Sequence, residues 1–136
     1  MSKSVLLCDD EVHILRAAEF KFQRAGFDVR TAADGLEGWE QILARRPDLL
    51  ITDWQMPRLD GFGLVQRIRA EESLSDLPII MLTAKGFEVS HEELRTHWGV
   101  RAVLAKPFSP RELLLRAEEL MAAAAEPAAA VTAARN

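Results

Sequence analysis

Short apolar segments recur along the chain and alternate with amphipathic stretches of helical spacing. Four of these segments are Val5–Cys8, Leu49–Thr52, Ile79–Leu82 and Val100–Leu104. Three of the four are nearly unbroken, which is typical of parallel strands covered on both faces. A fifth segment, Asp28–Ala32, alternates polar and apolar residues and indicates a strand at the edge of a sheet. The alternation predicts a doubly wound α/β fold with a five-stranded parallel sheet and five helices.

Residues that begin and end helices lie between these segments. The first helix places Leu15, Ala18 and Phe22 on one face and stops at Gly26, a typical C-terminal cap. Further helix starts are marked by capping boxes, namely Asp34 with Glu37, Ser90 with Glu93, and Ser109 with Glu112. Pro110 suits the first position of the last helix, because its missing N–H is not needed there. That helix has core spacing at Leu113, Ala117, Leu120 and Met121.

The regular pattern ends near Met121. A chain of 136 residues fits one domain, which we expect over residues 1–121. Residues 122–136 are mostly alanine, so they either extend the last helix as far as Glu126 or form a flexible tail.

Composition argues against several classes of protein. A net charge of −4 and a pI near 5.4 disfavour nucleic acid as a direct partner, because phosphates bind basic surfaces. No apolar run approaches the roughly 20 residues that span a membrane, and no signal-peptide pattern is visible. The single cysteine, Cys8, cannot form an internal disulfide and is expected to be a buried structural thiol. These features predict a cytoplasmic protein.

Polar residues follow the predicted strands at their carboxyl ends, where open parallel sheets bind ligands. Asp9, Asp10 and Glu11 follow the first strand, Asp53 the third, Thr83 the fourth and Lys106 the fifth. The sequence therefore brings carboxylates, a hydroxyl and an ammonium to one edge of the sheet.

These residue types together suit phosphoryl transfer. Two carboxylates about 4 Å apart repel by on the order of 4 kcal/mol at an effective dielectric constant of about 20, so the cluster needs a cation. Oxygen ligands with room for water and phosphate favour Mg²⁺, or Mn²⁺ in its place, over Ca²⁺ and zinc. Asp53 can then act as the nucleophile that forms an aspartyl phosphate. Lys106 would neutralise charge on the phosphoryl oxygens, and the hydroxyl of Thr83 would donate a hydrogen bond to one of them.

Each residue also has an ordinary structural interpretation. Asp9 and Asp10 can cap the first helix, and Asp53 can cap a turn. Thr83 can be a plain strand residue and Lys106 a solvated lysine. We favour the functional site, because the ordinary interpretations would have to hold at four separate strand ends at once.

Four motifs in order resemble the receiver domain of two-component response regulators, from about Ser4 to Met121. They are Cys8-Asp9-Asp10-Glu11, then Leu49–Pro57 with Asp60-Gly61, then Ile79–Lys85, and finally Lys106-Pro107-Phe108. One such motif is weak, but all of them at suitable spacing are highly specific. The resemblance implies a flavodoxin-like three-layer sandwich with strand order 2-1-3-4-5, as in the chemotaxis regulator.

The resemblance also implies roles for single residues. Asp53 would be the phosphoacceptor, Asp10 and Asp53 metal ligands, Asp9 a support through water, and the carbonyl of Gln55 a further ligand. Lys106-Pro107 would be a cis peptide. The protein would assist its own phosphorylation and dephosphorylation and would not otherwise be an enzyme.

Partners are implied in the same way. The phosphoryl donor would be a sensor histidine kinase or a histidine phosphotransferase, docking near Ile14 and Pro107-Phe108. His13, His91 and His97 are expected at the surface and not as donors. An unidentified downstream protein would contact strand five with helices four and five, and the resemblance also allows a phosphorylation-dependent dimer. Neither nucleic acid nor membrane is expected as a direct partner of this domain.

One position departs from the family pattern. Many members have an aromatic residue near the end of strand five that rotates inward when the switch threonine moves, and the matching residue here is Val103. We expect valine simply to fill the strand while loop and helix shifts carry the switch. The alternative is that Trp98 or Phe87 serves as the reporter. Trp54, directly after Asp53, is expected at the mouth of the pocket.

Three other readings stay open. The module can be part of a larger regulator. A magnesium-dependent phosphatase with an aspartyl nucleophile is the second, but it needs an acid where Gln55 stands. A flavin- or nucleotide-binding protein is the third, but its first loop should be rich in Gly, Ser or Thr, and here it is acidic.

Overall fold

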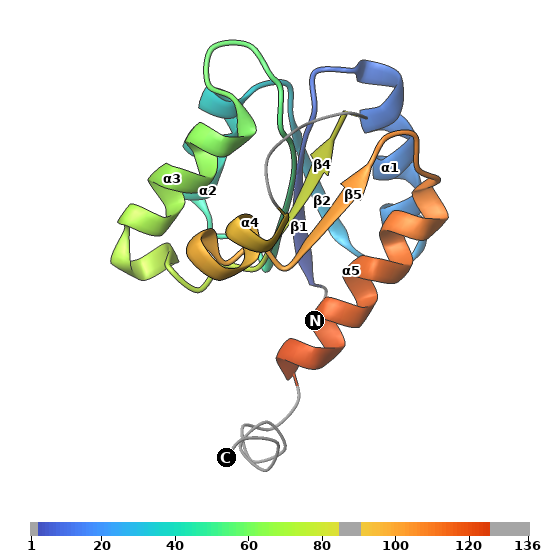
Figure 1. The fold of residues 1–136 in the computed structure, drawn as a ribbon. Coiled ribbons are helices and arrows are strands. Elements are labelled where there is room, and N and C mark those ends of the chain that lie inside the picture. Colours follow the sequence, from blue (N-terminus) through green and yellow to red (C-terminus); the bar gives the residue numbers. More distant parts are fainter. Residues whose placement is uncertain (1–2, 85–90, 126–136) are drawn as a thin grey trace.

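One parallel sheet forms the centre of the computed structural model, which describes residues 3–84 and 91–125 (Figure 1). Its strands are β1 (Ser4–Cys8), β2 (Asp28–Ala32), β3 (Leu49–Asp53), β4 (Ile79–Thr83) and β5 (Ala102–Ala105). They lie in the order β2-β1-β3-β4-β5. All four neighbouring pairs are parallel. The predicted doubly wound fold and its strand order are confirmed, with β2 at the edge as expected.

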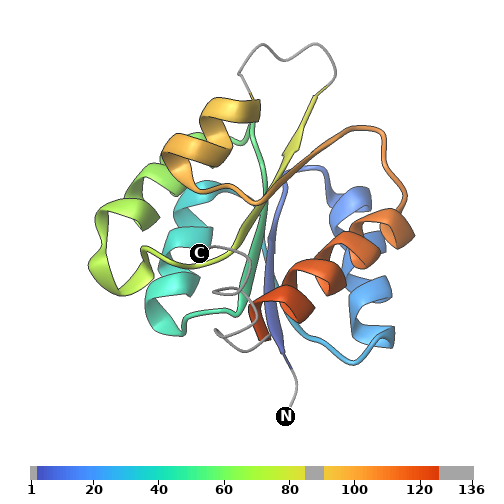
Figure 2. The same ribbon diagram turned by 60° about the horizontal axis from the view of Figure 1, so that its bottom comes forward.

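Helices cover both faces of this sheet. They are α1 (Val12–Arg24), α2 (Gly35–Ala44), α3 (Gly61–Ala70), α4 (His91–Trp98) and α5 (Pro110–Ala125), with a short 3₁₀ turn at Glu72–Leu74. Figures 1 and 2 show α1 and α5 on one side of the sheet and α2, α3 and α4 on the other. In the described part of the chain, no helix has the length and apolar character needed to cross a membrane.

Two apolar layers hold the sandwich together. Alternation along each strand sends successive side chains to opposite faces, so Leu50 packs in the layer under α2, α3 and α4, while Leu49 packs in the layer under α1 and α5. Phe22 of α1 and Leu113 of α5 are fully buried in the second layer. Burial on both faces explains why β1, β3 and β4 are nearly continuous apolar runs.

The last strand begins later than the sequence predicted. The prediction placed Val100 in the strand, but β5 starts at Ala102. Val100 is buried, yet its N–H donates to the carbonyl of Leu94 at 3.0 Å and so closes the end of α4. Its apolar side chain belongs to the core, whereas its backbone belongs to a turn. Strands β3 and β4 end at Asp53 and Thr83, so each includes the polar residue that closes its apolar run.

Helix termini follow the capping signals in the sequence. The Asp34 carboxylate accepts a hydrogen bond from the N–H of Glu37 at 2.9 Å, and Ser109 Oγ accepts one from Glu112 at 3.0 Å. Glu37 returns its bond to the N–H of Ala33, one residue before the position of a standard capping box. The box predicted at Ser90 lies outside the described residues.

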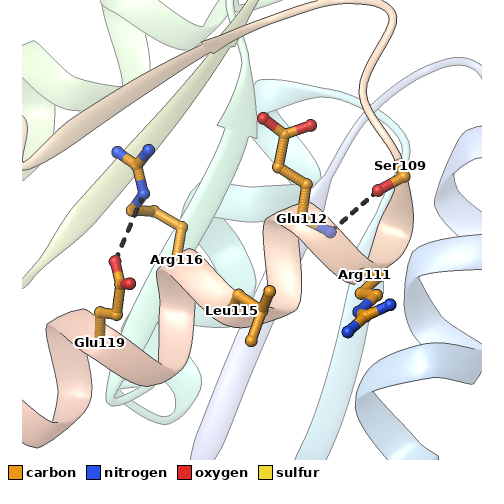
Figure 3. A pocket seen from close by; sticks show the side chains of 6 residues that line it. All are labelled: Ser109, Arg111, Glu112, Leu115, Arg116 and Glu119. Atoms are coloured by element: carbon orange, nitrogen blue, oxygen red, sulfur yellow. Dashed lines mark hydrogen bonds and ion pairs between the residues drawn. The ribbon is translucent and has the colours of Figure 1, made fainter.

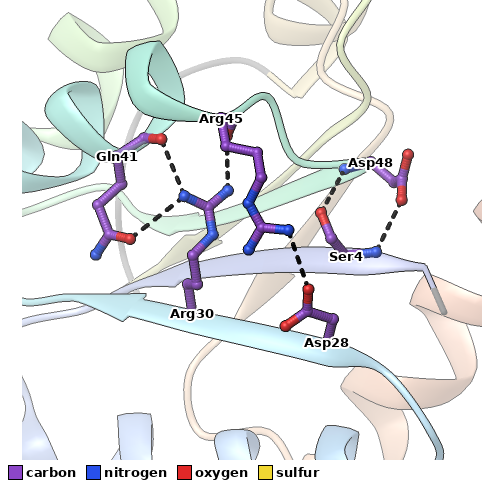
Figure 4. A network of polar contacts seen from close by, with 6 residues as sticks. All are labelled: Ser4, Asp28, Arg30, Gln41, Arg45 and Asp48. Carbon is purple, nitrogen blue, oxygen red and sulfur yellow. Dashed lines mark hydrogen bonds and ion pairs between the residues drawn. The ribbon is translucent and has the colours of Figure 1, made fainter.

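Polar contacts away from the predicted site link β1 and β2 to neighbouring segments (Figure 4). The Arg30 guanidinium donates to the carbonyls of Gln41 at 3.0 Å and Arg45 at 2.7 Å, at the C-terminal end of α2. Asp48 accepts a hydrogen bond from the N–H of Ser4 at 2.8 Å. These bonds tie β2 to α2, and the loop before β3 to β1.

Candidate functional site

The carboxyl ends of four strands converge at one edge of the sheet, as the sequence predicted. Asp9 and Asp10 directly follow β1, Asp53 is the last residue of β3 and Thr83 the last of β4. Lys106 directly follows β5, and its N–H donates to the carbonyl of Thr83 at 2.8 Å. Asp9, Asp53 and Thr83 are all buried, with 2%, 6% and 4% of their surface exposed. Asp10 is exposed.

Lys106 holds the acidic residues together. Its Nζ lies 3.1 Å from Oδ2 of Asp9 and 3.3 Å from Oδ2 of Asp53. A third carboxylate, that of Glu11, lies 3.2 Å away. The sequence prediction placed Glu11 at this strand end but gave it no role in the site. The signal was present, because Glu11 continues the acidic run of Asp9 and Asp10.

The pKa values of the two buried carboxylates in the site, Asp9 and Asp53, are both raised. Burial, together with the charge of Asp9, raises the pKa of Asp53 to about 6, against the opposing effect of Lys106. Burial also raises the pKa of Asp9, although the N–H of Glu11 and the ammonium of Lys106 act the other way. Burial by itself lowers the pKa of Lys106, but Asp9, Asp53 and Glu11 outweigh it, so the pKa is raised. Negative charge is in excess here.

The residues present fit a hard cation. Asp9, Asp10 and Asp53 each offer a carboxylate oxygen, and these atoms lie within 4.8 Å of one another. Oδ2 of Asp9 is buried and accepts no hydrogen bond from the described residues, although the Lys106 ammonium is near enough for charge attraction. An all-oxygen set with an unsatisfied buried oxygen suits Mg²⁺ or Mn²⁺. The ligand role of the Gln55 carbonyl stays a prediction.

Gly61 fixes the loop that follows Asp53. Its N–H donates to the carbonyl of Trp54 at 2.7 Å, and a Cβ at this position would overlap the carbonyl oxygen of Asp53. Asp60, the residue before it, caps α3 by accepting from the N–H of Gly63 at 2.8 Å. The start of α3 is therefore packed directly against the backbone of the predicted phosphoacceptor.

Trp54 does not lie at the pocket mouth. Only 8% of its surface is exposed, and its ring stacks on Phe62 in the apolar layer under α3. The prediction assumed that the side chain of Trp54 would point to the same side of the sheet end as that of Asp53. Side chains alternate along an extended chain, so Trp54 points to the same face as Leu50 and away from the carboxylate of Asp53.

The switch region is described in part. Thr83 is buried at the end of β4, and Val103, half-buried in β5, packs against the apolar layer under α4. Lys85 and Phe87 lie outside the described residues. That Thr83 acts as a switch, and that Val103 only fills its position in the strand, stay predictions.

The residues predicted to dock the phosphodonor are brought together. A groove of about 280 Å³ beside Lys106 is lined by His13, Ile14, Ala17, Lys106, Pro107, Phe108 and Pro110. The Lys106-Pro107 peptide is cis, as predicted. The groove is mostly apolar and lies beside Lys106, between the start of α1 and the residues that follow β5.

A second, shallower groove runs along the outer face of α5 (Figure 3). Leu115 lies in it with 50% of its surface exposed, and Arg116 lies 3.6 Å from Glu119. It contains none of the predicted site residues.

Comparison with known proteins agrees with the geometry. The family model described as "Response regulator receiver domain" matches residues 5–118. A probable transcriptional regulator, ycf27, of Cyanophora paradoxa is 39% identical over 96% of this chain and 53% of its own length. The alkaline phosphatase synthesis regulator PhoP of Bacillus subtilis is 36% identical over 89% of this chain and 49% of its own length. The chain thus spans about half the length of these curated relatives.

Two solved structures match over nearly their whole length. A response regulator of Chloroflexus aurantiacus has a TM-score of 0.80 and 37% identity, covering 90% of this chain and 99% of its own. The chemotaxis response regulator CheY4 of Vibrio cholerae has a TM-score of 0.77 and 33% identity, covering 88% and 98%. With this fold, these strand-end residues and these relatives, the chain belongs to the response regulator receiver domain family of two-component signalling.

Proposed function

We propose that this domain receives a phosphoryl group on a carboxylate oxygen of Asp53 and changes conformation when it carries that group. The observation that best supports this is the position of Lys106, whose ammonium lies 3.1 Å from Asp9 and 3.3 Å from Asp53. A half-buried lysine among buried acids is an expensive arrangement for structure alone. It is explained if an anionic phosphoryl group joins the cluster.

The donor in this proposal is a phosphohistidine of a sensor kinase or a histidine phosphotransferase. A carboxylate oxygen of Asp53 attacks phosphorus, and the new O–P bond forms as the P–N bond to the imidazole breaks. The electron pair of that bond stays on the leaving nitrogen, which takes up a proton. Lys106 neutralises the phosphoryl oxygens, and the hydroxyl of Thr83 donates a hydrogen bond to one of them.

A divalent cation completes this site in the proposal. Asp10 and Asp53 would hold Mg²⁺ or Mn²⁺ directly, with the carbonyl of Gln55 and, through water, Asp9. When bound, the ion neutralises negative charge on the transferring oxygens. The protein residues would orient the nucleophile and keep Lys106 within 3.3 Å of Asp53.

The output of the domain would be a change in affinity for a downstream protein at β5, α4 and α5. The curated relatives named above are transcriptional regulators about twice as long, so the same module can act within a longer regulator. These relatives do not support the phosphatase alternative. That mechanism also needs an acidic residue at position 55, where this chain has Gln55.

Phosphorylation by a small-molecule donor tests the proposal. We expect acetyl phosphate with Mg²⁺ to add one phosphoryl group to the wild type, seen by intact mass, and none to Asp53→Ala. The matched control is Asp76→Ala, which removes a carboxylate that is 83% exposed in its side chain and pairs with Arg46, away from the site. That control should be phosphorylated like the wild type. The proposal is wrong if the wild type gains no adduct or if Asp53→Ala gains an equal one.

A further inference from the structure

Three aromatic side chains form a continuous path along the face of the sheet under α3 and α4. The rings of Trp54 and Phe62 are stacked, with centroids 5.1 Å apart and planes inclined by 10°. The ring of Phe62 meets Trp98 edge to face, with centroids 5.3 Å apart and planes inclined by 84°. Both are favourable aromatic geometries, so the contacts resist independent movement of the rings. The path runs from the end of β3 to the last residue of α4.

The first ring of the path is bound to the phosphoacceptor strand. Trp54 directly follows Asp53, and its N–H donates to the carbonyl of Leu82 in β4 at 2.8 Å. Its own carbonyl accepts the N–H of Gly61 at 2.7 Å. A shift in the backbone at Asp53 therefore moves the base of the Trp54 ring. Phe62, in the first turn of α3, is its immediate stacking partner.

The last ring lies at a helix end that is held from outside the helix. Nε of Arg69 donates a hydrogen bond to the carbonyl of Trp98 at 2.7 Å, and Nη2 donates one to the carbonyl of Gly99 at 3.1 Å. The same guanidinium reaches the carbonyls of Leu74 at 3.4 Å and Ser75 at 3.0 Å. Arg69 thus joins α3 to the C-terminal turn of α4. In that turn the rings of His97 and Trp98 also contact each other, with centroids 5.5 Å apart.

β5 has no aromatic side chain, and Val103, where the family resemblance leads us to expect one, packs against the same apolar layer as the three rings. On the basis of the proposed phosphorylation of Asp53, we propose that Trp54, Phe62 and Trp98 act as the relay that carries the change at Asp53 to the C-terminal turn of α4. Phe62 is the positioning residue of this relay, since it alone contacts both tryptophans among the ring pairs of the described residues. The physical requirement for such coupling is an unbroken set of packed groups, and the rings supply it.

Indole N–H signals in nuclear magnetic resonance spectra test the relay, because Trp54 and Trp98 each give one. Mg²⁺ with beryllofluoride, an unreactive analogue of the phosphoryl group, is the probe. In the wild type we expect the signals of both Trp54 and Trp98 to shift on saturation. In Phe62→Leu the Trp54 signal should still shift, while the Trp98 shift falls to about half or less.

Two further variants separate coupling from general loss of packing. Phe27→Leu is the matched control, because Phe27 is also partly buried and its ring lies 5.3 Å from that of Phe22, in the apolar layer on the opposite face of the sheet. It should leave both shifts unchanged, and Phe62→Tyr, which keeps the ring, should restore the Trp98 shift. The relay is overturned if Trp98 stays still while Trp54 shifts in the wild type, or if Phe62→Leu keeps the full Trp98 shift. If the wild type fails to bind the probe, the proposed phosphorylation site fails first and the relay with it.

Discussion

Asp53 carries its charge in surroundings that disfavour it. Burial and the nearby charge of Asp9 raise its pKa to about 6 from the ordinary value of 3.8, in spite of Lys106. The folded protein therefore holds a proton on Asp53 at pH values where the unfolded chain has released it. Stability is highest below the unfolded pKa and is lost as pH rises through the folded pKa. A ligand that removes this repulsion, such as a divalent cation, should stabilise the fold.

Neutralising the side chain with Asp53→Asn should thus stabilise the metal-free protein. We expect almost no gain at pH 3, a growing gain as pH rises toward 6, and a constant gain on the order of 3 kcal/mol above it. Urea unfolding in the presence of a chelator, repeated across this pH range, measures the difference. Mg²⁺ should then stabilise the wild type more than the variant. A difference between the two proteins that is independent of pH would contradict the assignment.

Individual residues show why the site was only partly predictable. The strand-end positions of Asp9, Asp53, Thr83 and Lys106 follow from the sequence, because apolar runs end visibly where the polar residues begin. The direction of Trp54 was missed, because it depends on alternation past the end of a strand. The contact between Glu11 and Lys106 was missed as well, because it depends on rotamers across 95 residues of chain.

Among the elements, the junction of β3 and α3 leaves no room for a side chain at Gly61. Gly61→Ala would push a methyl group into the carbonyl oxygen of Asp53, so the start of α3 would have to move. We expect a loss of about 2 kcal/mol or more in the free energy of unfolding, measured by urea denaturation. We also expect slower phosphorylation by acetyl phosphate, because the backbone of Asp53 would shift.

Gly26→Ala is the control for the loss of a glycine as such. Gly26 has a φ of +96°, which strains a side chain, but no atom of the described residues lies within 4 Å of the new Cβ. It should cost on the order of 1 kcal/mol and leave the rate of phosphorylation unchanged. If both variants slowed phosphorylation equally, the contact between Gly61 and Asp53 would have no special role.

Element boundaries were predictable where one signal dominated. Asp28–Ala32 is found as predicted, because turn residues bound it on both sides. The start of β5 was misplaced, because a buried valine in a turn looks the same in sequence as a buried valine in a strand. Strand order was expected only through family resemblance, since apolar runs say which segments are strands but not which ones are neighbours.

For the molecule as a whole, the predicted limit of the domain at Met121 can be tested by truncation. Ala117 is fully buried, and Leu120 and Met121 pack against the layer under α1 and α5, whereas Ala122 and Ala123 are exposed. A chain that ends at Met121 should keep its free energy of unfolding within about 0.5 kcal/mol. A chain that ends at Arg116 should lose at least about 3 kcal/mol of apolar burial. Urea denaturation of both, compared with the full chain, checks the limit.

The pairing of Lys106 with Asp9 joins residues 97 positions apart, nearly the whole length of the domain. During synthesis, Asp9, Asp10 and Asp53 leave the ribosome long before β5 does. Until that last strand has docked, the acidic residues face solvent without their lysine and repel an incoming phosphoryl group. In the proposed function, competence to receive a phosphoryl group therefore arises in the same step that completes the sheet.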